Sequence, residues 1–257
     1  MKPAFHRFLL ISFGYLICAA LFSIAQAGEL KLALANSTCD AMEKAVDLYR
    51  ANNPVKFTLS CKSSGLLAKG LRGGALNADI FVSADREWMD FVVESGLVSA
   101  DRVFSPWGNS LVAAVPKNSP IQGLDWQELA SDKITVILIG DPSTAPFGRY
   151  AKEALEASGL WERVKGKIQT RKNIELLAES LATSSASTAG ILFKTNLTGQ
   201  LRQLHSVRMS LHSPIRYYMA PLKASAGNAE VTGFLKFMQS NAVKDIFRAE
   251  GFDVSMP

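Results

Sequence analysis

A regular alternation of strand-like and helix-like segments in the first part of the chain constrains its fold more than any other feature. Apolar and polar residues alternate in the strand-like segments, whereas apolar residues recur at helical spacing in the others. The strand-like segments are residues 29–35, 55–59 and 78–83, and the helix-like segments are 40–50, 66–71 and 85–94. A β-α-β-α-β-α order predicts a parallel, doubly wound sheet, whose ligands bind beyond the carboxyl ends of its strands.

A second set of segments follows Pro106-Trp107-Gly108, which breaks this pattern. It comprises strand-like runs at residues 110–115, 134–139 and 190–193, a short helix over 126–130, and helices that open near Arg149 and Asn173. Residues 214–221 then form a strand-like run that returns to the first unit, and strongly amphipathic helices end the chain.

Two α/β lobes joined by two crossings, near residues 105–112 and 213–220, are the simplest architecture for this order of segments. We predict that residues 28–108 and 217–257 form lobe I and that residues 109–216 form lobe II. A chain of this length is long enough for two such lobes.

Four short turns each precede a helix-like run and are rich in small residues. They are Asn36-Ser37-Thr38, Ser63-Ser64-Gly65, Ala145-Pro146-Phe147-Gly148 and Asn173-Ile174. Helix N-termini carry unpaired N–H groups and the positive end of the helix dipole, so several of them aimed at one point bind an anion without Lys or Arg. The alternative is that these residues are ordinary helix caps, since Ser37 with Asp40 resembles a capping box.

The first 27 residues indicate export. A basic start precedes an apolar stretch from Phe8 to Phe22, and Ala25-Gln26-Ala27 has the small-x-small pattern of a cleavage site. A membrane anchor is the alternative, but the stretch is short for a spanning helix, which needs about 20 residues. We expect cleavage after Ala27 and a periplasmic mature protein.

Cleavage lowers the formal net charge from +5 to +3, because Lys2 and Arg7 leave with the signal. Basic residues are scattered rather than gathered in a stripe, so we expect no nucleic-acid partner. Cys39 and Cys61 remain in the mature chain. In an exported protein two cysteines are compatible with one disulfide, and equally with two buried free thiols.

The sequence offers little support for a catalytic or metal-binding site. His205 and His212 fit no metal-ligand spacing, and neither a nucleophile elbow nor a Walker loop occurs. Asp79, Asp85 and Asp90 permit a carboxylate-pair hydrolase, although a strand and a helix cap explain them more simply. Tyr217-Tyr218 permits a ferric iron site, but neighbouring side chains of a strand point to opposite faces.

Several blocks in fixed order resemble the periplasmic molybdate-binding proteins of bacterial ABC importers. The most specific is residues 78–90, ADIFVSADREWMD, and the others are 108–111 (GNSL), 140–142 (GDP), 148–155 (GRYAKEAL) and 247–252 (FRAEGF). The resemblance covers the whole mature chain. It implies a two-lobed binding protein of type II, with a mostly parallel sheet flanked by helices in each lobe and the ligand in the cleft.

The resemblance also implies a ligand set, which is Ser37, Ser64, Phe147, Ile174 and Phe193. The family commonly has Ala at position 147 and Val at position 174, and both positions bind through backbone N–H groups. The family usually has Tyr at position 193, so Phe193 removes one side-chain donor.

The implied function is capture of molybdate or tungstate by a monomer, for delivery to a permease in the inner membrane, with no catalysis and no cofactor. The alternatives are a receptor for another oxyanion such as sulfate, a receptor for ferric iron, and an exported hydrolase.

Overall fold

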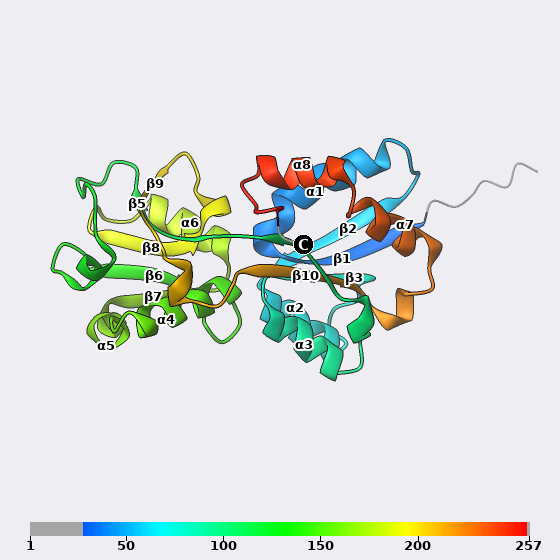
Figure 1. Ribbon diagram of the computed structural model, residues 1–257, viewed down its shortest axis with the longest axis horizontal. Coiled ribbons are helices and arrows are strands. Elements are labelled where there is room, and N and C mark those ends of the chain that lie inside the picture. Colours follow the sequence, from blue (N-terminus) through cyan, green and yellow to red (C-terminus); the bar gives the residue numbers. More distant parts are fainter. Residues whose placement is uncertain (1–27, 256–257) are drawn as a thin grey trace, which may run out of the picture.

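Two five-stranded sheets, each flanked by helices, lie side by side in the computed structural model, which describes residues 28–255 (Figure 1). The expected signal segment, residues 1–27, lies outside the described residues. We call the unit around the first sheet lobe I and the unit around the second sheet lobe II. The expected α/β architecture of two lobes is thus confirmed.

Lobe I has the strand order β2-β1-β3-β10-β4. Its strands are β1 (Glu29–Ala35), β2 (Lys56–Lys62), β3 (Ile80–Ser83), β4 (Phe104–Gly108) and β10 (Arg216–Pro221). Its helices are α1 (Cys39–Arg50), α2 (Ser64–Arg72), α3 (Arg86–Glu94), α7 (Ala229–Phe237) and α8 (Asn241–Ala249). Leu30, Leu32 and Leu34 alternate into the core beneath α1, as the sequence predicted, while Ala33 faces α2 and α3.

Lobe II repeats this plan with the strand order β7-β6-β8-β5-β9. Its strands are β5 (Leu111–Pro116), β6 (Val136–Gly140), β7 (Ile168–Arg171), β8 (Thr188–Phe193) and β9 (Leu201–Ser206), and its helices are α4 (Pro146–Ala157), α5 (Trp161–Val164) and α6 (Ile174–Ala182). In each sheet one strand runs against its neighbours, β10 in lobe I and β5 in lobe II. Each is the strand by which the chain enters that sheet from the other lobe. Because the other four strands of each sheet run in one direction, both sheets are mostly parallel, as expected.

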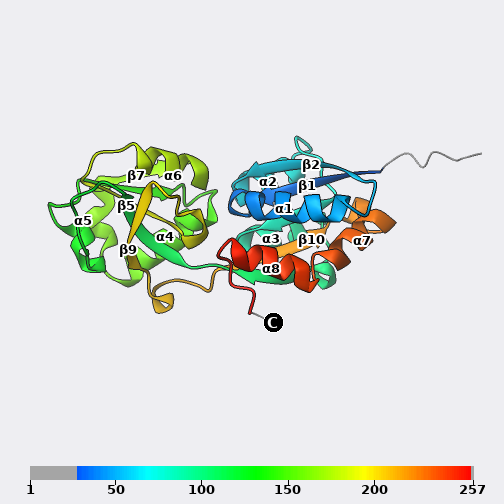
Figure 2. The same ribbon diagram turned by 90° about the horizontal axis from the view of Figure 1, so that it is seen from above.

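The two crossings run next to each other between the lobes (Figures 1 and 2). The first is the short link from β4 to β5, and the second leads from β9 to β10. The backbone N–H of Asn109 in the first donates to the carbonyl of Ile215 in the second, with an N···O distance of 3.2 Å. Gly108 and Asp253 exchange two backbone hydrogen bonds beside them, which ties the C-terminal segment to the same place.

The short helix predicted over 126–130 is present as the 3₁₀ helix Trp126–Ala130. Two other local predictions were wrong. Pro106-Trp107-Gly108 does not break the pattern but lies in β4, where Pro106 is tolerated because β4 is an edge strand. The Ser37–Asp40 capping box does not form: a 3₁₀ turn, η1 (Asn36–Thr38), precedes α1, and the Ser37 hydroxyl bonds to Tyr217 instead.

Cys39 and Cys61 form a disulfide, so the bridged alternative describes this structure. The bond joins the start of α1 to β2 across a separation of 22 residues, both within lobe I. Closing a loop of this length in the unfolded chain stabilises the fold by about 3 kcal/mol in the chain-entropy account. Within residues 28–255, the helices are too short or too polar for any of them to cross a bilayer.

Candidate functional site

The four predicted turns meet at one small cavity between the lobes. Each lies at the carboxyl end of a strand: the first two follow β1 and β2 of lobe I, and the other two follow β6 and β7 of lobe II. The cavity is lined by Ala35, Asn36, Ser37, Ser63, Ser64, Ala84, Pro146, Phe147, Asn173, Ile174 and Phe193. All five residues of the predicted ligand set therefore lie around the same space.

Lobe I presents hydroxyl groups to this cavity. Ser64 is completely buried, and its Oγ accepts the backbone N–H of Ala84 at 3.0 Å. Because that hydrogen bond uses an oxygen lone pair, the Ser64 hydroxyl proton stays free to donate. The Ser37 Oγ lies 2.7 Å from the Tyr217 hydroxyl.

Two further polar residues of lobe I lie in the predicted turns but outside the predicted ligand set. Asn36 and Ser63 are only 6% and 4% exposed, and the described residues offer no hydrogen-bond partner to either amide atom of Asn36 or to the Ser63 Oγ. A buried polar atom without a partner costs about 1–3 kcal/mol, so such atoms require an explanation. Their place directly after the strands β1 and β2 was the available signal. A ligand with acceptor atoms in the cavity would satisfy the Asn36 NH₂ group and the Ser63 hydroxyl, whereas the Asn36 Oδ1 is itself an acceptor and requires a donor.

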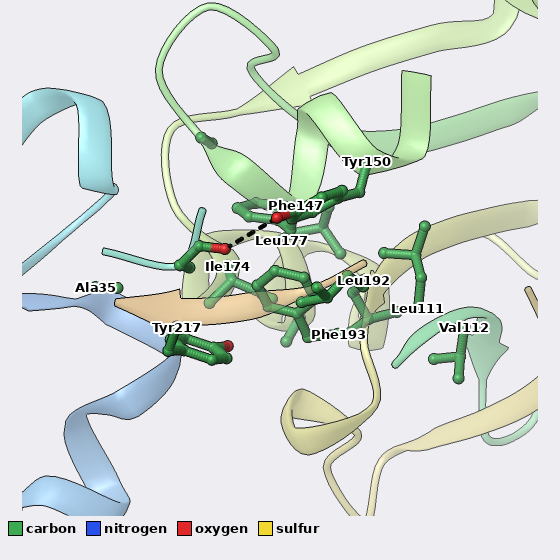
Figure 3. Packing of buried hydrophobic residues seen from close by; sticks show 14 of the residues in the cluster. Ala35, Leu111, Val112, Phe147, Tyr150, Ile174, Leu177, Leu192, Phe193 and Tyr217 are labelled. Carbon is green, nitrogen blue, oxygen red and sulfur yellow. Dashed lines mark hydrogen bonds between the residues drawn. The ribbon is translucent and has the colours of Figure 1, made fainter. Parts of the chain in front are cut away.

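Lobe II presents backbone and apolar groups instead. Phe147 is the second residue of α4 and Ile174 is the first residue of α6, so their N–H groups have no partner within the helix. The Asn173 side chain caps α6 by accepting the N–H of Leu176 at 2.8 Å. The Phe147 and Phe193 rings pack edge to face with centroids 6.0 Å apart, beside Ile174 (Figure 3).

A pair of glycines brings α4 close to the end of β6. A Cβ atom built on Gly148 would lie 2.2 Å from the carbonyl oxygen of Gly140, which no side chain can tolerate. Glycine at these two positions therefore lets the positive end of α4 reach the cavity.

Among the described residues, no ionisable side chain lines the cavity. A buried ion pair whose residues do not line the cavity joins the two lobes: Arg149 of α4 contacts the Asp85 carboxylate at 2.9 Å. Asp85 also caps α3 by accepting the N–H of Trp88 at 3.0 Å. Burial raises the pKa of Asp85 to about 6, against the lowering effect of Arg149.

Direct contacts hold the lobes together around the cavity. The N–H of Gly65, at the start of α2, donates to the carbonyl of Thr144 in lobe II at 2.9 Å. The Tyr150 hydroxyl of α4 donates to the carbonyl of Ala84 at 3.4 Å (Figure 3). The lobes are thus closed on each other.

The residues considered for other chemistry are placed elsewhere. Tyr217 is fully buried and Tyr218 only partly, and they point to opposite faces of β10, as predicted. Asp79 accepts hydrogen bonds from the Lys31 N–H and the Ser225 hydroxyl, and Asp90 pairs with the guanidinium of Arg86. In residues 28–255, no cluster of three or more His, Cys, Asp or Glu side chains has the geometry to hold a metal ion.

Comparison with known proteins identifies the family. The model of the bacterial extracellular solute-binding protein family matches residues 30–253. The chain belongs to this family. It is also 31% identical to the molybdate-binding protein ModA of Haemophilus influenzae, over 94% of this chain and 96% of that protein.

Solved structures agree with the family assignment. A substrate-binding domain of a putative molybdenum ABC transporter from Clostridium difficile is 26% identical, with a TM-score of 0.69 over 88% of this chain and 99% of that one. The periplasmic molybdate-binding protein of Azotobacter vinelandii superposes with a TM-score of 0.78 over 89% of this chain and 99% of that one, at 18% identity. The solute-binding fold and the predicted resemblance to molybdate-binding proteins are therefore confirmed.

Proposed function

We propose that this solute-binding protein captures molybdate or tungstate outside the cytoplasm and delivers it to an ABC permease. One observation carries the proposal: a cavity that has no ionisable side chain among its described lining residues lies where helix N-termini of both lobes and serine hydroxyls of lobe I converge. The similarity to proteins named for molybdate binding over nearly the whole chain supports the choice of ligand.

The proposed ligand set is Ser37, Ser64, Phe147, Ile174 and Phe193, with Asn36 and Ser63 added. A tetrahedral dianion has only acceptor atoms, so hydroxyl, amide and backbone N–H donors satisfy it while the helix dipoles offset its charge. Asn36 and Ser63 add polar contacts from lobe I, whereas Phe193 of lobe II has no hydroxyl to contribute. Phe193 itself closes the wall by ring packing rather than by a hydrogen bond.

Selectivity follows from the chemistry of this wall. Monohydrogen phosphate carries one O–H donor, for which the lining offers no carboxylate and only neutral acceptors such as the Asn36 Oδ1. Where the O–H faces the serine hydroxyls or the backbone N–H groups instead, it is buried without an acceptor, which costs about 1–3 kcal/mol. We therefore expect phosphate to bind about tenfold to a hundredfold less tightly than molybdate, since about 1.4 kcal/mol is a factor of ten. Sulfate is smaller, so in a rigid cavity some of its hydrogen bonds would exceed about 3.2 Å and weaken.

Calorimetric titration of the purified protein at pH 7.5 with molybdate, tungstate, sulfate and phosphate tests this function. The expected order is molybdate and tungstate together, then sulfate, then phosphate. Sulfate or phosphate binding as tightly as molybdate would overturn the choice of ligand. Hydrolysis of phosphate or sulfate esters by the same preparation would overturn the binding role.

We propose that the signal is cleaved after Ala27, that the mature protein is periplasmic and monomeric, and that it meets its permease at the inner membrane. Intact mass spectrometry of the exported protein tests the cleavage. A mass that includes residues 1–27, or a lipid on Cys18, would contradict it.

A further inference from the structure

A chain of hydrogen bonds leads from the first crossing to the cavity. The Asn109 Nδ2 lies 3.0 Å from the Tyr217 hydroxyl oxygen, which in turn lies 2.7 Å from the Ser37 Oγ. The same Nδ2 lies 2.9 Å from the Thr195 Oγ1 of lobe II. Neither Asn109 nor Tyr217 lines the cavity, but Ser37 does.

The direction of each hydrogen bond in this chain is determined. The Asn109 Oδ1 accepts the backbone N–H of Ser110 at 2.8 Å, so the NH₂ group of the amide faces Tyr217. An amide nitrogen can only donate, and the Tyr217 oxygen therefore accepts. Tyr217 is fully buried, and burial raises its pKa far above its usual value, so the hydroxyl keeps its proton. That proton has the Ser37 Oγ as its acceptor.

Ser37 is consequently left with one free proton and acts as a donor toward its remaining surroundings. An unconstrained serine hydroxyl either donates or accepts, as its partner requires. With one lone pair already accepting from Tyr217, Ser37 directs its proton to an oxyanion with bare oxygens and keeps a single lone pair for an oxyanion that carries a proton.

We propose that Asn109 and Tyr217 are positioning residues that hold Ser37 as a hydrogen-bond donor, and that this polarity favours fully ionised tetrahedral oxyanions over protonated ones. The inference rests on the proposed function, because it assumes that Ser37 contacts an oxyanion. These hydrogen bonds connect the first crossing, where Asn109 follows β4, with Tyr217 in β10, the strand into which the second crossing leads. They reach lobe II through Thr195. The polarity of Ser37 is therefore set where the lobes are joined.

Reversing the direction of these hydrogen bonds tests the proposal. In Asn109→Asp, the introduced carboxylate accepts from Tyr217, which must then accept from Ser37, so the Ser37 lone pairs face the cavity. Tyr217→Phe removes the middle link and keeps the ring that packs against Trp107 and Phe252. Asn196→Asp is the matched control, because Asn196 lies near Ser37 at the edge of the cleft and its side chain bonds to Thr195 but not to Tyr217.

Dissociation constants for molybdate, sulfate and phosphate at pH 7.5 provide the measurement. Relative to wild type, Asn109→Asp should lower the phosphate-to-molybdate and phosphate-to-sulfate ratios by about tenfold or more, and Tyr217→Phe by about threefold. Asn196→Asp adds the same charge nearby and should weaken all dianions alike, leaving both ratios within about twofold.

The outcomes separate the inference from the proposed function. Unchanged ratios in Asn109→Asp and Tyr217→Phe, even with weaker binding overall, would mean a merely structural role and overturn the inference alone. A wild-type preference for sulfate would overturn molybdate as the ligand, while the phosphate-to-sulfate ratio would still test the polarity of Ser37. Wild-type protein that binds none of these anions would overturn both.

Discussion

The two walls of the cavity are built from different chemistry. Lobe I contributes polar side chains from the ends of β1 and β2, whereas lobe II contributes two helix starts and aromatic rings from the ends of β6, β7 and β8. Both lobes have the same sheet plan, with one antiparallel strand each. The two lobes thus share a sheet topology but line the cavity with different chemical groups.

This difference predicts which substitutions the site tolerates. A backbone N–H donor survives a change of side chain, so positions 147 and 174 accept Phe and Ile without loss of the donor. A hydroxyl donor disappears with its side chain. Lobe I should therefore be sensitive to small polar changes, and lobe II to changes of volume or backbone position.

The largest effect is expected from Gly65→Ala, which acts where the lobes meet. A Cβ atom there would lie 2.7 Å from the Thr144 carbonyl oxygen of lobe II and 2.6 Å from the Trp88 ring. Because closure is blocked, molybdate affinity should fall about a hundredfold or more, equal to about 2.7 kcal/mol. Gly70→Ala on the same helix is the control, since its new methyl contacts only Leu76 within lobe I. Calorimetry that finds the Gly65 variant unchanged would contradict closure at this point.

Removing hydroxyls from lobe I should come next. Ser37→Ala and Ser64→Ala should each weaken molybdate binding by about tenfold to a hundredfold, because a hydrogen bond to a charged group contributes about 1.5–3 kcal/mol. Ser64→Ala also leaves the buried N–H of Ala84 without its acceptor. Ile174→Val in lobe II is the matched control and should change affinity less than about threefold. Equal losses of molybdate affinity in all three variants would contradict the proposed difference between the two walls.

The ion pair between the lobes predicts a dependence of stability on pH. Burial raises the pKa of Asp85 from its ordinary value of 3.8 to about 6, so the folded state binds this proton more tightly than the unfolded state. The stabilisation from this group is complete below its unfolded pKa and is lost as the pH rises through about 6.

Urea unfolding of wild type and Asp85→Asn at pH 4.5 and 7 checks this effect. Relative to the variant, wild type should lose about 2 kcal/mol of unfolding free energy between these two pH values. Asparagine keeps the cap of α3, so the comparison isolates the charge. A wild-type advantage that grows with pH would show that the pair with Arg149 outweighs burial.

The smallest effect is expected from Phe193→Tyr, which adds a hydroxyl to the apolar wall. The new donor should improve molybdate affinity by no more than about tenfold. Packing of Phe147 against the ring works against this gain, because the two centroids are only 6.0 Å apart. The same change in a Phe147→Ala background should show the gain more clearly. If neither background binds more tightly, position 193 has no polar role.

Much of the framework was determined by the sequence alone. The alternation of apolar residues in Glu29–Ala35 and the helical spacing after it require a parallel sheet, since each segment must bury one face. The same logic placed the first two turns at the carboxyl ends of strands. Such local patterns survive folding because they depend on side-chain period and not on the partner. The edge strand β4 was missed because Pro106 reads as a break until its neighbours are known.

Only the tertiary structure decided how the polar groups are paired. No spacing in the sequence indicates that Ser37 meets Tyr217, 180 residues away, or that Asn109 orients both. Nor does any local pattern show that Asn36 and Ser63 are buried without partners while Asp85 reaches Arg149. These pairings depend on which strand ends face each other when the two lobes are closed. Hydrogen-bond direction and burial are properties of that arrangement in space, whereas secondary structure is already present in the order of the residues.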